Sequence, residues 1–383
     1  MTHHPSNPSS PARFETFCPG RRLASPSHPS LWREREMESL PVPSVQAMVA
    51  ATGGAHVPAR YLRPEVAADA VVNDGEAAIP IVDFQRLLHP EESRDESARL
   101  HAACQEWGFF QLINHGVPDG LIQGMKANIQ GFFGLPAETK QQFAQQRGHL
   151  EGYGQLFVVS EDQKLDWADV LYLNTQPPQH RNMRFWPDKP DTFRSKLDAY
   201  SAAVKNVADR LLVIMSKNLG LQPEVIANKC VGGLQSVRMN FYPPCAHADK
   251  VVGFSPHSDA DLLTLVLQVN EVQGLQVKRD DDTWVPVHPL EGAFIVNVGD
   301  ILQIFTNGRY RSVEHRAVVD TERERLSVAA FHSPSIHATI GPLTELVSDQ
   351  EMMMYKTVDH ESFMKLFFSA KLDGKSFLQR MKL

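Results

Sequence analysis

The stretch PHSDADLLTLV, residues 256–266, joins a His-x-Asp triplet directly to an apolar run that is typical of a buried β-strand. Side chains two residues apart on a strand point to the same face, so His257 and Asp259 can bind one metal ion from one surface. A second triplet, with His247 and Asp249, follows two prolines in a polar segment typical of a turn. The sequence therefore favours His257 and Asp259 as metal ligands and predicts that His247 and Asp249 are solvated loop residues.

Short strands are predicted on both sides of this stretch. After Leu234, segments rich in Val, Ile, Leu, Phe and Tyr alternate with Gly, Pro, Asp and Asn, which indicates a β-sandwich or barrel. The predicted strands are QSVRMNFY, LLTLVLQ, GLQVKR, TWVPV, AFIVNVGD, ILQIF and RLSVAAFH.

Helices are predicted before this β-rich part, near residues 96–107, 118–134 and 137–146, and again near 343–383. The longest should run from about Thr192 to Leu219, with Asp191 as its N-cap and Gly220 at its end.

Composition and periodicity divide the chain into three regions. Residues 1–36 are rich in Pro, Ser, His and Arg without an apolar period. We expect a disordered tail or an extension from an upstream start codon there, with a transit peptide as the alternative. Residues 37–200 are predicted to form a helix-rich N-terminal region. Residues 201–383 are predicted to form the strand-rich catalytic region with helices at its end.

The overall composition excludes several classes of protein. In a chain of 383 residues, 42% hydrophobic and 22% charged residues are ordinary for a globular protein. A formal net charge of −7 disfavours a general nucleic-acid binder. The four cysteines contain no CxxC pattern, and no apolar run is long enough for a transmembrane helix. We therefore expect a cytoplasmic monomer that has neither a nucleic acid nor a membrane as a partner.

A third metal ligand is needed, and His315 in the predicted strand RSVEHRAV is the candidate. Two His and one carboxylate on one face of an octahedral ion are the ligand set of non-haem Fe(II) oxygenases, and they leave positions open for other ligands. Zinc hydrolases also use two His and a carboxylate, so this set alone leaves the metal undecided.

Two further polar pairs occur at strand spacing. Arg325 and Ser327 lie two residues apart and can bind a carboxylate through a guanidinium fork and a hydroxyl, which suits the far end of a dicarboxylate chelator. Asn240 and Tyr242 likewise share one strand face. Ordinary sheet pairing is the alternative interpretation of Asn240 and Tyr242.

Taken together, the motifs resemble the plant-type 2-oxoglutarate- and Fe(II)-dependent dioxygenases from about residue 40 to the C-terminus. The motifs are WGFFQLINHGVP (107–118), MNFYPPC (239–245), PHSDADLLTLV (256–266), GDILQIFTNGRYRSVEHRA (299–317) and RLSVAAF (325–331). The resemblance implies an α+β fold whose core is a distorted double-stranded β-helix, or jelly roll, flanked by helices.

The resemblance also assigns roles to residues. It implies that His257, Asp259 and His315 bind Fe(II) and are catalytic. It further implies that the C5 carboxylate of the co-substrate 2-oxoglutarate is held by Arg325 and Ser327, with help from Tyr242 and Asn240. O₂ is the other co-substrate, and ascorbate is expected as an additional cofactor.

The substrate is less well defined. In the family, the positions of Arg238 and Phe331 face the substrate, and a Phe wall suits an aromatic molecule, although core packing is an equally good interpretation. Tyr153 and Phe157 are weaker candidates, from a loop that resembles the branch containing alkaloid O-demethylases. The sequence thus predicts hydroxylation or oxidative O-demethylation of a small aromatic plant metabolite or hormone.

Two alternatives remain open. One is an ascorbate-dependent Fe(II) oxidase that uses no 2-oxoglutarate, similar to aminocyclopropanecarboxylate oxidase, which also carries an Arg-x-Ser pair. The other is a non-catalytic small-molecule binder on the same fold, which the intact His and Asp pattern disfavours.

Overall fold

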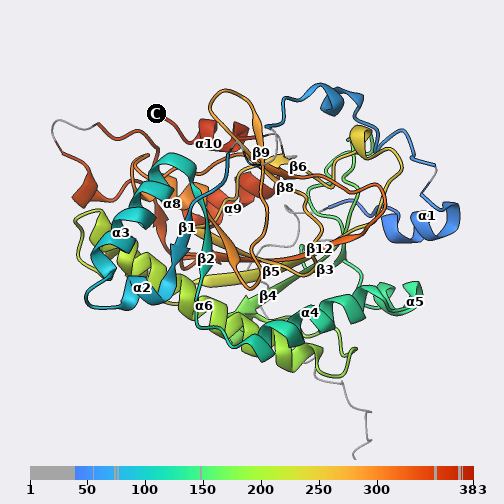
Figure 1. Ribbon diagram of the computed structural model, residues 1–383, viewed down its shortest axis with the longest axis horizontal. Coiled ribbons are helices and arrows are strands. Elements are labelled where there is room, and N and C mark those ends of the chain that lie inside the picture. Colours follow the sequence, from blue (N-terminus) through green and yellow to red (C-terminus); the bar gives the residue numbers. More distant parts are fainter. Residues whose placement is uncertain are drawn as a thin grey trace, which may run out of the picture. The chain divides into compact units, whose positions relative to one another are not determined.

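The computed structural model describes residues 39–383, apart from residues 55, 73, 74, 76, 147, 148, 349–351, 370, 371 and 373. The predicted tail, residues 1–36, lies outside the described residues. Within the described part, a large and a small β-sheet form the centre, with helices around them (Figure 1).

The two sheets contain most of the predicted strands. The large sheet consists of β1 (Ile81–Asp83), β2 (Phe109–Ile113), β3 (Gly152–Gly154), β4 (Asp169–Gln176), β5 (Leu234–Tyr242), β7 (Leu263–Gln268), β10 (Phe294–Val298) and β12 (Arg325–Ser333). Its order is β1-β2-β10-β7-β12-β5-β4-β3. The small sheet consists of β6 (Phe254–His257), β8 (Leu275–Lys278), β9 (Trp284–Pro286) and β11 (His315–Ala317), in the order β6-β11-β8-β9. A separate pair joins β13 (Thr339–Ile340) to β14 (Val358–Asp359).

The helices also follow the sequence pattern closely. Among the described residues, the α-helices are α1 (Val45–Thr52), α2 (Phe84–Leu88), α3 (Ser93–Ala102), α4 (Asp119–Phe133), α5 (Ala137–Gln141), α6 (Phe193–Asn218), α7 (Val225–Lys229), α8 (Asp300–Phe305), α9 (His360–Phe368) and α10 (Ser376–Arg380). A π-helical turn extends α3 through Ala103–Trp107. The helices predicted near 96–107, 118–134 and 192–219 are confirmed, whereas the one predicted at 137–146 is shorter.

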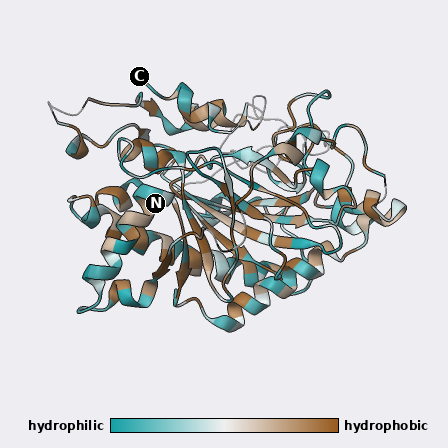
Figure 2. Cartoon of the chain, turned by 45° about the horizontal axis from the view of Figure 1, so that its top comes forward, coloured by the Kyte–Doolittle hydropathy of each residue, from teal (hydrophilic) through white to brown (hydrophobic). Residues whose placement is uncertain are grey.

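The large sheet has two chemically different faces, because alternate residues of each strand point to opposite sides. Met239 of β5 pairs with Leu171 and Val328, and this apolar face packs against α4 and α6. On that side Phe133 of α4 stacks on Phe241 with ring centroids 5.3 Å apart. Figure 2 shows the hydrophobic residues concentrated in the central strands. We call this side the helix face, and the opposite side, which carries Arg238, the inner face.

The small sheet lies against the inner face. The guanidinium carbon of Arg238 on β5 is 4.0 Å from the ring centroid of Phe254 on β6. Phe109 on β2 contacts His315 on β11 edge to face, with ring centroids 5.2 Å apart. The chamber between the two sheets is therefore lined by the alternate residues that do not face the helices.

Helix α6 supports the helix face. Its stripe of Leu197, Tyr200, Val204, Val207, Leu211 and Met215 is at most 2% exposed. Gly220 follows its end with a φ of +76°, as predicted. The prediction that Asp191 caps the helix was wrong. The helix begins one residue later than that cap requires. Thr192 is the N-cap but its side chain caps no helix N–H group, and the Asp191 carboxylate pairs with Lys189.

One strand prediction was also wrong. The segment ILQIF was predicted as a strand but lies within α8, whose backbone closes the helical bond from Gln303 N–H to Gly299 O at 3.0 Å. A short run of mostly apolar residues carries no period that distinguishes a buried strand from a buried helix. The strand predicted from RSVEHRAV is likewise reduced to the three residues of β11.

The boundary predicted between residues 200 and 201 falls inside α6, and the large sheet takes strands from both sides of it. The division into regions stays a prediction. Among the described residues, no helix is both long and apolar enough to span a bilayer.

Candidate active site

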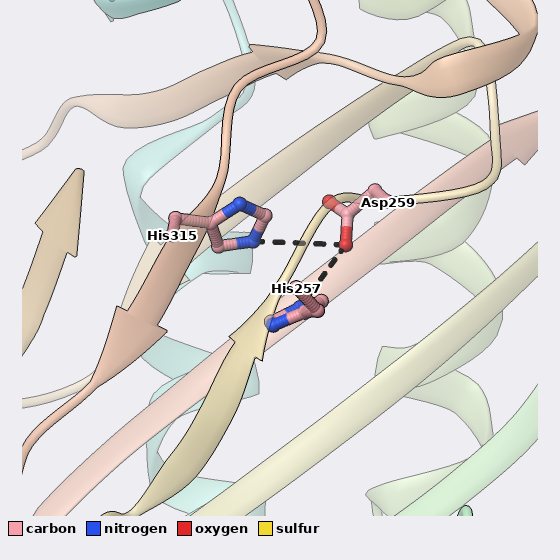
Figure 3. A group of neighbouring side chains, drawn as sticks. All are labelled: His257, Asp259 and His315. Carbon is pink, nitrogen blue, oxygen red and sulfur yellow. Dashed lines mark ion pairs between the residues drawn. The ribbon is translucent and has the colours of Figure 1, made fainter. Parts of the chain in front are cut away.

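Three side chains meet at one edge of the small sheet. His257 ends β6 and His315 begins β11, and the two residues are direct partners across these antiparallel strands. Asp259 lies just beyond the end of β6, in the connection to β7. His257 and Asp259 therefore do not share a strand face as the sequence suggested, because Asp259 is delivered by the turn. One potential ligand atom from each lies within 4.8 Å of the others (Figure 3).

The two imidazoles are oriented by their own backbone. Nδ1 of His257 donates to the carbonyl of Ser255 at 2.8 Å, and Nδ1 of His315 donates to the carbonyl of Val313 at 3.1 Å. A carbonyl oxygen can only accept, so each Nδ1 carries the proton and each Nε2 keeps its lone pair. The Nε2 atoms of His257 and His315 lie 3.4 Å and 3.7 Å from Oδ1 of Asp259.

This donor set fits a divalent metal ion. The buried Nε2 of His257 has no hydrogen-bond partner in the protein, which is costly for a buried polar atom unless a ligand completes it. Burial, with the nearby charge of His257 next in size, lowers the pKa of His315 to about 4, so His315 is neutral and able to coordinate near pH 7. Burial acts to raise the pKa of Asp259. The electrostatic influence of His315 and His257 and the hydrogen bond from Asn297 outweigh burial and hold that pKa well below its usual range.

Arg325 forms a second candidate site on the inner face. It is 3% exposed, its Nε has no partner, and no carboxylate in the described part of the chain pairs with it. One Nη2–H···O bond of 2.9 Å to Gln268 positions the guanidinium, and its carbon lies 5.1 Å from the ring centroid of Tyr242. A Cβ at Gly274 would lie 2.6 Å from Cδ of Arg325, so glycine makes room for this side chain. A buried cation without a counter-ion is an anion-binding site in chemical terms.

The four residues predicted around the carboxylate form two cross-strand pairs. Arg325 faces Tyr242, and Ser327 faces Asn240, between β12 and β5. Asn240 Nδ2 donates to Ser327 Oγ at 3.2 Å, while Asn240 Oδ1 has no partner. The structure therefore brings all four predicted residues together.

Successive rows of inner-face side chains connect the triad with Arg325. The row at the triad consists of Phe331, Thr264, Asn297 and Phe109, and the next rows consist of Arg238, Ala329 and Val266, then Asn240, Ser327 and Gln268, then Tyr242 and Arg325. Neighbouring rows are about 7 Å apart, because two residues separate them along each strand. Ala329 and Val266, in the intermediate row, are small, which suits a slender molecule that reaches from the triad to Arg325.

Arg238 and Phe331 lie at this chamber, as the sequence suggested. The guanidinium of Arg238 lies between two rings, at 4.0 Å from the Phe254 centroid and 5.2 Å from the Phe331 centroid. Arg238 is 8% exposed, its Nε has no partner, and no described carboxylate pairs with it. Among the described residues, the free-energy cost of burying the Arg238 guanidinium is therefore offset by its contacts with these two ring faces.

The structure does not bring Tyr153 to the chamber. Tyr153 pairs with Leu171, which belongs to the helix face, and its ring contacts Phe132 with centroids 5.9 Å apart. Phe157 stacks on Phe368 of α9, with centroids 5.4 Å apart. The contacts of Phe157 thus lie with the C-terminal helix rather than with the triad.

His247 and Asp249 are exposed. His247 is the N-cap of the short 3₁₀ helix Ala248–Lys250, which contains Asp249, so only the prediction of exposure holds for Asp249. The metal-binding group found among the described residues includes neither of them. Three residues that were not predicted from the sequence hold Asp259 and Arg325 in place: Thr264, Asn297 and Gln268. All three lie in strands that were identified, so strand alternation could have placed them on the inner face. The register that makes them neighbours of the site was not visible in the sequence.

Two family descriptions match the chain: "non-haem dioxygenase in morphine synthesis N-terminal" over residues 79–189 and "2OG-Fe(II) oxygenase superfamily" over residues 233–334. The chain is 48% identical to 2-oxoglutarate-dependent dioxygenase 11 of Oryza sativa subsp. japonica, across 91% of this chain and 98% of the relative. It is 46% identical to oxoglutarate-dependent flavonoid 7-O-demethylase 1 of Ocimum basilicum, across 92% of this chain and 95% of the relative. The crystal structure of JOX2 in complex with 2OG, Fe and JA matches with a TM-score of 0.82 and 34% identity, covering 90% of this chain and 98% of that one.

The two-sheet core and the grouping of two His with one Asp are features of non-haem iron oxygenases. The chain belongs to the 2-oxoglutarate- and Fe(II)-dependent dioxygenases. It is an oxidoreductase that uses Fe(II) and 2-oxoglutarate, and the predicted α+β jelly-roll fold is confirmed.

Proposed function

We propose that this dioxygenase hydroxylates or oxidatively O-demethylates a small aromatic metabolite. In this proposal His257, Asp259 and His315 hold the Fe(II), and Arg325 and Ser327 hold the far carboxylate of 2-oxoglutarate. When bound, Fe(II) with 2-oxoglutarate and O₂ supplies the oxidising power, and succinate and CO₂ are released.

The observation that carries the proposal is the presence of two incomplete sites in one chamber. The triad offers three ligand atoms within 4.8 Å of one another, and among the described residues no carboxylate pairs with the Arg325 guanidinium. A molecule with a chelating group at one end and a carboxylate at the other completes both, and 2-oxoglutarate is such a molecule. Ser327 adds a hydroxyl that can donate to the same carboxylate, and Asn240 Nδ2 positions this hydroxyl by donating to its oxygen at 3.2 Å.

Arg238 and its neighbouring rings support an aromatic substrate that carries oxygen. Phe254 and Phe331 offer flat apolar surface, and the unpaired guanidinium between them offers donors to an ether, carbonyl or acidic oxygen. The name of the Ocimum basilicum relative, a flavonoid 7-O-demethylase, describes a substrate of this kind. Hydroxylation of a methoxy carbon gives a hemiacetal that loses formaldehyde, so the same residues serve both outcomes.

The test is substrate-dependent turnover of 2-oxoglutarate by the purified full-length chain with Fe(II) and ascorbate. Matched pairs of methoxylated and hydroxylated aromatic compounds would be supplied, with succinate assayed beside mass spectrometry. We expect succinate together with a product heavier by one oxygen or lighter by one CH₂. Substrate oxidation with ascorbate but without 2-oxoglutarate would instead establish the ascorbate-dependent oxidase.

We also infer a monomeric, cytoplasmic enzyme. The cysteines within the described residues, Cys104, Cys230 and Cys245, are all unpaired, which supports a reducing compartment. Size-exclusion chromatography with light scattering measures the oligomeric state directly, and a mass of twice the chain would contradict the monomer.

A further inference from the structure

The two oxygens of Asp259 have different surroundings. Oδ1 faces the Nε2 atoms of both histidines. Oδ2 accepts a hydrogen bond of 2.5 Å from Thr264 Oγ1 and another of 2.7 Å from Asn297 Nδ2. Both hydrogen-bond donors therefore contact Oδ2, the carboxylate oxygen that does not face the two histidines.

The two donors come from rigid positions. Thr264 on β7 and Asn297 on β10 are direct register partners in the centre of the large sheet, and each is 1% exposed. Asp259 itself lies in a turn, so its own backbone is not held by a strand ladder. The sheet thus fixes the carboxylate plane from outside the turn that delivers it.

The orientation has a consequence for coordination. A carboxylate that binds through both oxygens occupies two positions on a metal ion, whereas one that binds through a single oxygen occupies one. With two histidines, the second arrangement leaves three positions of an octahedral ion for a chelating co-substrate and O₂. Engaging Oδ2 with two hydrogen bonds makes its rotation toward the metal costly.

We propose that Thr264 and Asn297 are positioning residues that hold Asp259 as a one-oxygen metal ligand. This inference rests on the proposed role of Asp259 as a ligand. The contrasting interpretation is that the two donors only satisfy a buried carboxylate and stabilise the fold.

Three variants separate these interpretations. Thr264→Val keeps the shape and removes the hydroxyl, Thr264→Ser keeps a hydroxyl, and Asn297→Leu replaces the amide by an apolar group of similar size. Thr175→Val is the matched control, because Thr175 is an equally buried threonine of the same sheet whose hydroxyl bonds to Gln235 at 2.5 Å, away from Asp259.

The readouts are Co(II) affinity by anaerobic titration, the visible absorption spectrum of the Co(II) protein, and the melting temperature with and without metal. We expect Thr264→Val and Asn297→Leu to weaken metal binding by about 10- to 100-fold, to change the Co(II) spectrum and to reduce the metal-induced rise in melting temperature. Thr264→Ser should keep the wild-type Co(II) affinity, Co(II) spectrum and metal-induced rise in melting temperature. Thr175→Val should also keep these three properties, and should only lower the melting temperature, both with and without metal.

Unchanged Co(II) affinity and spectrum in Thr264→Val and Asn297→Leu would overturn the inference, even if the melting temperature fell. A different result would contradict the proposed function itself. If Asp259→Ala bound Co(II) as tightly as the wild type, Asp259 would not be a ligand at all. If Thr264→Val or Asn297→Leu melts below the assay temperature, the titration and the spectrum are recorded at a lower temperature at which the variant is folded, and unchanged values there would overturn the inference.

Discussion

The two faces of the large sheet have different roles, so neighbouring residues of one strand contribute either to stability or to ligand binding. Met239 on the helix face is fully buried among apolar residues, whereas Arg238 and Asn240 on either side of it carry polar atoms without protein partners. The helix face completes its contacts within the chain, and the inner face leaves contacts for ligands. Substitutions one residue apart on β5 or β12 should therefore affect different properties.

The largest effect is expected between the two His-x-Asp triplets. His257→Ala removes a proposed metal ligand in the chamber and should reduce succinate formation at least about 1,000-fold. His247→Ala removes an exposed loop side chain and should leave activity within about twofold. Substrate-dependent succinate assays on both variants test this contrast, and the reverse result would show that the wrong triplet was chosen.

The next effect concerns the anion site. Arg325→Gln should weaken 2-oxoglutarate binding by about 100-fold or more, because the partner of a buried carboxylate is lost. The same substitution should not lower the stability of the ligand-free protein, since it removes a buried charge that has no counter-ion. KM for 2-oxoglutarate and a denaturant midpoint measure the two properties. A large loss of stability with unchanged KM would place Arg325 in a purely structural role.

Met239→Ala is the matched change on the helix face. Truncating this fully buried side chain should cost about 2–4 kcal/mol of unfolding free energy, while KM for 2-oxoglutarate stays within about twofold. Urea unfolding and the succinate assay supply the two numbers. If KM rose as much as in Arg325→Gln, the separation between the two faces would not hold.

The smallest expected effect is a dependence of the unfolding free energy on pH, which arises on the helix face. His332 on β12 lies between the carbonyl of Leu263 and the amide of Gln235, and burial lowers its pKa to about 3. The unfolded chain therefore binds this proton more readily, and the stability that the neutral ring contributes is lost as pH falls below about 6.5. Between pH 7 and pH 5, wild type should lose about 2 kcal/mol more than His332→Leu. Equal losses in urea unfolding would show that His332 does not carry the effect.

Much of the fold could be read from local patterns. Alternation and apolar runs located β5, β7, β10 and β12, and the apolar stripe from Phe193 to Ile214 located α6 to within one residue at each end. The failures occurred where a pattern is locally ambiguous. The run ILQIF is too short and too uniformly buried to show a period, and Asp191 precedes its helix by one residue too many to cap it.

The sequence by itself selected the residues that we propose to carry the chemistry: His257, Asp259 and His315, with Arg325 and Ser327 at strand spacing. Only the tertiary structure decided how they are used. Pairing across β7 and β10 sets Thr264 and Asn297 against one oxygen of Asp259, and pairing of β3 with β4 turns Tyr153 toward the helices. The physical reason is that residue type and spacing are local, whereas register, burial and the absence of a partner arise only when distant strands meet.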